Sequence, residues 1–76
     1  MSAAFSLAAR GPVDVALYAV NGRRLRTLVR GVREAGEYSL TWDGRDDDGA
    51  PAPAGVYYLR MVTPQGRFTR MLTYLK

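Results

Sequence analysis

The sequence lacks cysteine and histidine altogether, and its only lysine is Lys76. Without cysteine the chain forms no disulfide and offers no thiolate to a metal ion. Without histidine it lacks the side chain that most often transfers protons at neutral pH. The hydroxyls of Ser6 and Ser39 have no base as partner, and no pair of carboxylates lies in an apolar context suited to acid–base catalysis. We therefore expect no enzymatic activity, no catalytic residue and no cofactor.

Long apolar runs are also missing. No stretch approaches the roughly 18 residues that a membrane-spanning helix requires, so we expect no membrane span. The N-terminus lacks the basic-then-apolar pattern of a signal peptide, and the residues after Met1 already alternate like a strand. We interpret residues 1–76 as a single domain, the C-terminal fragment of a longer protein whose targeting signal lies upstream.

The composition is that of a globular domain, with 47% hydrophobic and 24% charged residues. The net charge of +4 is carried by arginine, and five arginines fall between positions 23 and 33, which raises the question of nucleic acid. Four aspartates crowd the neighbouring segment 43–48, however, and the arginines are not interleaved with the stacking aromatics of single-strand binders. We expect no nucleic-acid binding.

Short runs of β-forming residues recur along the chain, each closed by glycine, proline, aspartate or asparagine. Runs that alternate between apolar and polar residues in this way are typical of half-buried strands, and their regular spacing indicates a sandwich or a barrel. We predict an all-β, antiparallel fold of six to seven strands. The expected strands are 3–9, 13–19, 24–29, 38–42, 56–62 and 67–75.

A hairpin is predicted at Asn21-Gly22, because both residues tolerate the positive φ of a type I′ turn. In the strand that follows, Leu25, Leu28 and Val29 break the alternation by one position. That slip indicates a β-bulge or the end of a strand.

The middle of the chain predicts a connection bracketed by Gly31 and Gly36, followed by a strand that buries Tyr38, Leu40 and Trp42 on one face. Residues at the inward positions of all strands should form the core of the sandwich. The residues that we expect to be mostly buried are Phe5, Val15, Leu17, Leu40, Trp42, Tyr57 and Leu59.

The segment 43–49 invites a calcium hypothesis, with Asp43, Asp46 and Asp48 as candidate ligands. Calcium sites gather carboxylate and carbonyl oxygens from one loop, but Gly44 occupies a position where an EF-hand loop supplies an oxygen, and no glutamate follows at the required distance. Aspartate and glycine are also what tight turns select. We therefore predict that turn hydrogen bonds hold this loop and that no metal does.

The aromatic residues allow two interpretations. Trp42 and Tyr57 are expected to fill the space between the sheets, whereas Tyr18, Tyr58 and Tyr74 are open to either a buried or an exposed position. An exposed row of aromatic side chains would favour carbohydrate binding, which we keep as a third functional hypothesis.

Several short motifs follow one another along the chain in a distinctive order. Taken together they resemble the immunoglobulin-like domain of the flagellar hook-capping family and the related type A sorting domain of the type IX secretion system. The motifs are Leu17-Tyr18, Asn21-Gly22-Arg23, Leu28-Val29, Ala35-Gly36-Glu37-Tyr38, Thr41-Trp42-Asp43-Gly44, Gly55-Val56-Tyr57-Tyr58 and the last strand from Arg70.

This resemblance implies an immunoglobulin-like β-sandwich without catalytic activity, exported to the periplasm, the cell surface or the medium. It implies a C-terminal sorting or anchoring module of a secreted or surface protein or, alternatively, a structural domain of a hook cap or another surface assembly. The partners would be proteins, either the export or assembly machinery or the upstream domains of the same chain.

The last strand is the predicted contact surface. A terminal strand that is paired on one side only offers backbone donors and acceptors to a partner by strand addition. The residues expected to bind a partner are Arg70, Met71, Leu72, Thr73, Tyr74, Leu75 and Lys76.

Overall fold

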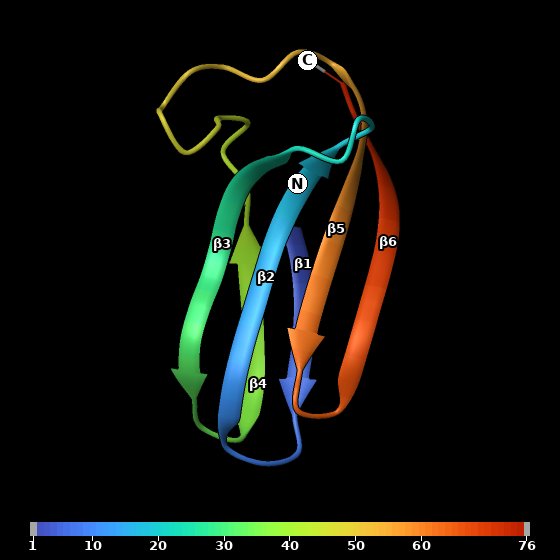
Figure 1. Cartoon of the computed structure of the whole chain (residues 1–76). Coiled ribbons are helices and arrows are strands. Elements are labelled where there is room, and N and C mark those ends of the chain that lie inside the picture. The colour runs from blue at the N-terminus through green and yellow to red at the C-terminus, as the bar shows by residue number, and fades with distance from the viewer. Residues whose placement is uncertain (1, 76) are drawn as a thin grey trace.

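The computed structural model describes residues 2–75, which form six strands (Figure 1). Because the chain alternates between β-formers and turn residues, strands account for the regular structure of this part, and no helix in it could cross a membrane. The strands are β1 (Ser2–Leu7), β2 (Gly11–Ala19), β3 (Arg24–Arg33), β4 (Gly36–Thr41), β5 (Gly55–Thr63) and β6 (Gly66–Tyr74).

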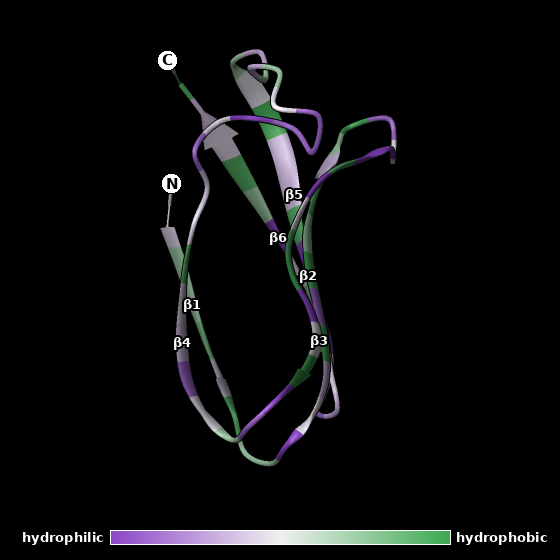
Figure 2. Ribbon diagram, turned by 90° about the vertical axis from the view of Figure 1, so that its left-hand side faces the viewer, coloured by the Kyte–Doolittle hydropathy of each residue, from purple (hydrophilic) through white to green (hydrophobic). Residues whose placement is uncertain are grey.

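The strands build two antiparallel sheets of unequal size. One has two strands in the order β1-β4, and the other has four in the order β3-β2-β5-β6. Seen from the side, the two sheets face each other as separate layers (Figure 2). The predicted all-β antiparallel sandwich is confirmed, with six strands in the described chain.

Strand β2 lies between β3 and β5 and supplies the centre of the core. Its alternating residues Val13, Val15 and Leu17 are buried, as their spacing predicts, because they point toward the two-stranded sheet. The complete buried cluster consists of Leu7, Val13, Val15, Leu17, Trp42, Ala52, Tyr57 and Leu59.

The hairpin between β2 and β3 is present, but the predicted type I′ turn is wrong. No described residue other than glycine has a positive φ, so Asn21 cannot adopt the I′ conformation. Instead the Gly22 N–H donates to the Ala19 carbonyl, and Gly22 takes the left-handed conformation at φ +86°. The chain thus uses a three-residue loop, in which only glycine needs a positive φ.

The expected bulge in β3 is confirmed, and it is double. The register with β2 shifts twice, which leaves Leu28 and Leu25 without a partner on β2. Both leucines pack against the core, and the bulge at Leu28 lets its side chain turn inward although its neighbour Val29 already faces the core opposite Val15.

Two other expectations need correction. Gly31 does not open a connection, since β3 continues through it to Arg33 and only residues 34 and 35 join β3 to β4. Phe5, Tyr38 and Leu40 are half-buried rather than buried. Their sheet has two strands, so each of its strands has one edge without a neighbour, and the Phe5 ring stacks on Tyr38 beside it at a centroid distance of 5.1 Å.

Candidate protein-binding site

One side of the sandwich is open along β6. In Figure 1, β1 and β4 lie behind the other strands, and no described strand lies behind β6. The free edge of β1 faces this opening, because β4 pairs with its other edge. The open side is therefore a consequence of packing two strands against four.

The inner face of β6 carries apolar and basic side chains toward this opening. Phe68 pairs with Met61 on β5, which in turn lies beside the buried Val15, so Phe68 points inward. Phe68 is nevertheless 54% exposed, because none of the six described strands covers it. Arg70 pairs with the buried Leu59, shares the same face and is also exposed.

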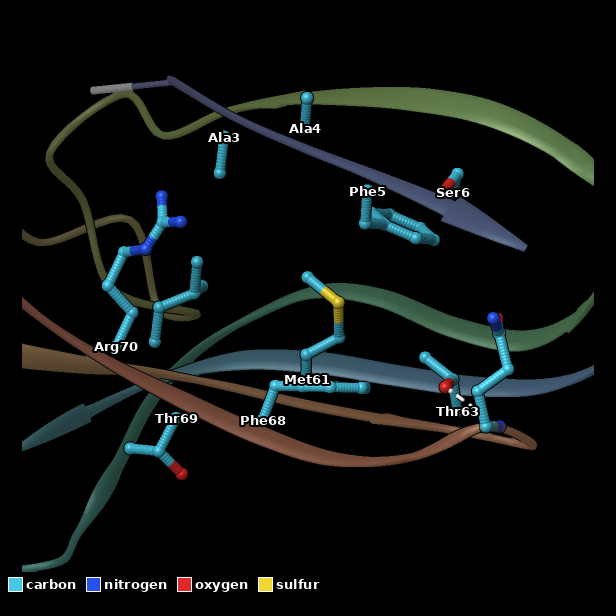
Figure 3. A pocket seen from close by; sticks show the side chains of 11 residues that line it. Ala3, Ala4, Phe5, Ser6, Met61, Thr63, Phe68, Thr69 and Arg70 are labelled. Atoms are coloured by element: carbon cyan, nitrogen blue, oxygen red, sulfur yellow. Dashed lines mark hydrogen bonds between the residues drawn. The ribbon is translucent and has the colours of Figure 1, made fainter. Parts of the chain in front are cut away.

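These side chains and those of β1 enclose a groove of about 460 Å³ (Figure 3). Figure 3 shows Met61, Phe68 and Arg70 directed toward β1, with Phe5 opposite Met61 and Thr69 turned away. At one end, the Gln65 side chain lies 3.4 Å from the backbone nitrogen of Ala8. The lining residues are Ala3, Ala4, Phe5, Ser6, Leu59, Met61, Thr63, Gln65, Phe68, Thr69 and Arg70, and none of them is acidic.

Strand β1 has none of the features that usually protect an exposed edge. Its six residues contain no charge and no proline, and its pairing with β4 runs without a bulge. Strand β6, the edge of the larger sheet, carries Arg67 and Arg70. Strand β3, the opposite edge, is partly covered, because the Asp47 side chain accepts a hydrogen bond from the Thr27 N–H and the Asp47 N–H donates one to the Leu25 carbonyl.

The loop between β4 and β5 contains the three aspartates of the calcium hypothesis, and hydrogen bonds within the protein hold this loop. Asp46 Oδ1 accepts bonds from the backbone N–H groups of Asp48 and Ala50, both at 2.9 Å. Asp43 Oδ1 accepts one from the Arg45 N–H at 3.0 Å. The Asp48 side chain is exposed. The predicted turn hydrogen bonds are confirmed, and among residues 2–75 no three acidic side chains converge as metal ligands.

Gly44 in this loop has a structural reason to be glycine. Its φ is +80°, and a Cβ atom at this position would collide with the hydroxyl of Tyr74. The position that a calcium loop would fill with an oxygen ligand is therefore used for close packing of the loop against β6.

Three aromatic side chains pack beneath the loop. Trp42 is 3% exposed, contacts Tyr57 edge to face at 5.4 Å and contacts Tyr74 at 4.8 Å between ring centroids. Its indole N–H donates to the Arg45 carbonyl at 2.8 Å, and the Tyr57 hydroxyl donates to the Pro53 carbonyl. The expected burial of Trp42 and Tyr57 is confirmed.

The outer face of the larger sheet places Tyr18 and Tyr58 side by side. The guanidinium of Arg24 lies 5.4 Å from the centre of the Tyr18 ring, on which a sugar would have to stack. Of this pair, Tyr58 is then the ring that remains free to stack on a sugar, and one ring is a small stacking surface. The arrangement therefore gives carbohydrate binding little support.

Arg24 also forms a bidentate ion pair with Asp14, with N–O distances of 3.2 and 3.0 Å. The hydrogen bond from Arg24 lowers the pKa of Asp14 below its ordinary value of 3.8. Nearby, Arg26 donates to the Asp46 carbonyl at 3.0 Å. Two arginines of the basic segment are thus engaged with groups of the protein itself.

The predicted partner-binding residues do not all lie on the same face of β6. Arg70, Leu72 and Tyr74 face inward and Met71 and Thr73 outward on β6, Leu75 follows the strand and is exposed, and Lys76 lies outside the described residues. As predicted, β6 is an edge strand. Sequence reasoning missed the groove and the part of β1 in it. A signal was present in the uncharged segment 2–7, which is unusual for an edge strand.

Comparisons with known proteins match the chain to FlgD proteins. A family model described as the FlgD Ig-like domain matches residues 2–67. The basal-body rod modification proteins FlgD of Salmonella typhimurium and Salmonella typhi are each 39% identical over 46 residues, which cover 60% of this chain and 20% of those proteins. The crystal structure of FlgD from P. aeruginosa superposes with a TM-score of 0.69 and 29% identity, covering 97% of this chain and 59% of that one. The chain thus spans one fifth of the length of the curated relatives and less than two thirds of the solved one.

Proposed function

Because this chain belongs to the FlgD Ig-like domain family, we propose that it is a non-catalytic structural domain that binds other proteins when a flagellar hook cap is assembled. The family match over residues 2–67 is the observation that carries the proposal. The absence of cysteine and histidine from the sequence agrees with a role that involves no chemistry.

The location that follows from this proposal is the flagellum outside the cytoplasm. The partners are other proteins of the assembly or further domains of the same polypeptide. We place the contact on the open side of the sandwich, where the inner face of β6 is uncovered and residues 70–75 lie at the sheet edge. In an assembly, uncovered strand edges of this kind can pair with strands of neighbouring proteins.

The matches to known proteins support this structural role and give no support to the C-terminal sorting or anchoring role that the sequence also suggested. The family model, the two curated relatives and the solved structure described above are all FlgD proteins. The resemblance to the type IX sorting domain rests on the order of the sequence motifs alone, and a shared fold does not carry function from one family to another.

The test is an in-frame deletion of this domain from its parent gene in the source bacterium. We expect cells that lack complete hooks by electron microscopy and do not swim, with the remaining parent protein still at the location of the wild type. Normal hooks in the deletion strain would contradict the proposal. Retention of the parent inside the cell would support sorting instead.

Deleting the domain can also destabilise the parent protein and lower its abundance. A point variant separates this effect from the loss of a contact. Arg70→Glu reverses the one charge in the groove and keeps the strand exposed to solvent. Arg67→Glu makes the same charge change on the outer face of β6. We expect the Arg70 variant, at wild-type abundance, to impair hook assembly more than the Arg67 variant. Equal effects would argue against a contact on the open side.

A further inference from the structure

We propose that the groove between β1 and β6 binds one extended strand of a partner protein, which adds to the free edge of β1 and places a carboxylate beside Arg70. The inference rests on the proposed function in that the domain binds proteins, and it specifies the chemistry of the partner. Three features of the groove support it: the backbone of β1, the uncovered apolar side chains and the isolated positive charge.

The backbone of β1 is a ready template for strand addition. One edge pairs with β4 along all six residues from Ser2 to Leu7, and the other faces the groove. An edge with no charge, proline or bulge pairs readily with another strand, which is why proteins usually protect such edges. An added strand would give the smaller sheet a third member and extend it over β5 and β6.

The apolar lining requires alternate apolar side chains on the incoming strand. Phe5 on one sheet and Met61 and Phe68 on the other point into the groove, and Phe68 is 54% exposed on a face that is otherwise the core of the sandwich. Side chains at every second position of a strand beside β1 would point at Met61 and Phe68. The groove therefore selects a strand with apolar residues at alternate positions.

The charge distribution selects an acidic residue. Arg70 is the one charged residue in the lining of the groove, and it lies toward the Ala3 end of β1 in Figure 3. A carboxylate on the incoming strand at that level would form an ion pair with Arg70 in a partly desolvated position.

The same requirement argues against a second copy of this chain as the occupant. Strand β1 has no acidic residue, so pairing of two β1 edges would leave Arg70 without a partner. Asp14 of β2 is already paired with Arg24, and Glu37 of β4 lies on the exposed face of its strand, opposite Ser6. The described strands therefore offer no free inward-facing carboxylate, which favours a strand of a partner protein over a second copy of this chain as the occupant.

The test uses the 76-residue chain and a fluorescently labelled peptide of alternating threonine and valine, about as long as β1. In the probe peptide the valine nearest the C-terminus is replaced by glutamate, which places the carboxylate beside Arg70 when the peptide lies antiparallel to β1. A matched peptide carries lysine at that position. We expect the glutamate peptide to bind with at least about tenfold higher affinity by fluorescence anisotropy, the effect of one partly buried charge pair.

Variants then locate the binding site. Arg70→Glu should reverse the preference, so that the lysine peptide binds more tightly, whereas Arg67→Glu should leave the preference unchanged. Phe68→Glu should abolish binding, whereas Met71→Glu, a change at a residue on the outer face that is 64% exposed, should not. Circular dichroism and thermal unfolding confirm that each variant is folded before its binding is measured.

Several outcomes would overturn the inference: no binding of either peptide, equal binding of both peptides, an Arg70 variant that keeps the wild-type preference, or a Phe68 variant that binds normally. A concentration-dependent dimer that Phe68→Glu dissociates would show that a second copy occupies the groove, which also overturns it. Failure of the peptide experiment together with defective hooks in the deletion strain would remove this inference and leave the proposed function intact. If the domain binds the peptide but its deletion leaves hooks normal, this inference stands and the proposed function is removed.

Discussion

Two aromatic clusters of the sandwich have the same kind of side chains but differ in what covers them. Trp42, Tyr57 and Tyr74 lie under the β4–β5 loop, where Trp42 is 3% exposed. Phe5 and Phe68 line the open groove, where Phe68 is 54% exposed. Strand alternation places all of them at positions that face the other sheet. A long loop closes one end of the sandwich, but within residues 2–75 no strand closes the other side. The difference separates the part of the core that stabilises the fold from the part that we propose as a binding surface.

The largest expected effect is that of Trp42→Ala at the closed end. Removing a large buried aromatic side chain costs about 3 to 5 kcal/mol, because packing is lost and a cavity is left. For a domain of this size that is a large share of the total stability, so the variant should be mostly unfolded at room temperature. Urea denaturation followed by far-ultraviolet circular dichroism measures this, and a midpoint close to that of the wild type would contradict the assignment of Trp42 to the core.

The second effect concerns the loop that covers Trp42. Asp46→Ala removes the acceptor of two backbone hydrogen bonds at 2.9 Å. We expect the free energy of unfolding to fall by about 1 to 2 kcal/mol, as it does when a side chain that accepts backbone hydrogen bonds at a helix N-terminus is removed. Asp46→Asn keeps an oxygen acceptor and should lose less. Asp48→Ala, at an exposed side chain in the same loop, is the control. Equal midpoints for the two alanine variants in denaturant would show that the loop does not depend on Asp46.

The closed end could be predicted from the sequence better than the open side, for physical reasons. Trp42 and Tyr57 are apolar positions in alternating runs, and the many aspartates and glycines of segment 43–49 identify a turn-rich loop. Alternation also identifies which residues of β6 face inward. It does not say how many strands the opposite sheet contains, which is why Phe5 and Leu40 were expected to be buried. The predicted conformation of Asn21 is wrong because Asn-Gly occurs both in two-residue type I′ loops and in three-residue loops. The three-residue loop needs a positive φ at glycine only.

A smaller effect is expected on the outer face, away from both clusters. Asp14→Asn breaks the bidentate pair with Arg24, and a partly exposed pair of this geometry contributes about 0.5 to 1 kcal/mol. Because the pKa of Asp14 is lowered in the folded state, the pair stabilises the fold fully above the ordinary value of 3.8 and progressively less as the pH falls below it.

The wild type and the Asp14→Asn variant should therefore differ in melting temperature at neutral pH and converge in acid. Asp48→Asn serves as a control for the loss of one negative charge. A difference between wild type and variant that grows below pH 4 would contradict the assigned direction of the shift.

A still smaller effect is expected on the open side, where Phe68→Thr tests the comparison most directly. Phe68 and Trp42 both point inward, but water already contacts most of Phe68. Threonine keeps a β-forming residue at the position, so the stability change should stay within about 0.5 kcal/mol, as for surface substitutions. The same variant should lose the proposed peptide binding. A loss of about 2 kcal/mol or more would show that the groove is packed in solution.

The smallest expected effect is that of calcium on the closed end, where we predict no change in melting temperature between excess calcium and excess chelator. Oxygen atoms that a cation would need already accept hydrogen bonds from the chain: Asp46 Oδ1 from two N–H groups, Asp43 Oδ1 from one and the Asp46 carbonyl from Arg26. A cation that used these oxygens would compete with these bonds and with the charge of Arg26, whose guanidinium lies 4.0 Å from Asp43. Since any ligand that binds only the folded state raises its stability, a calcium-dependent rise of several degrees would contradict this prediction and show that the loop is held by a metal rather than by the protein alone.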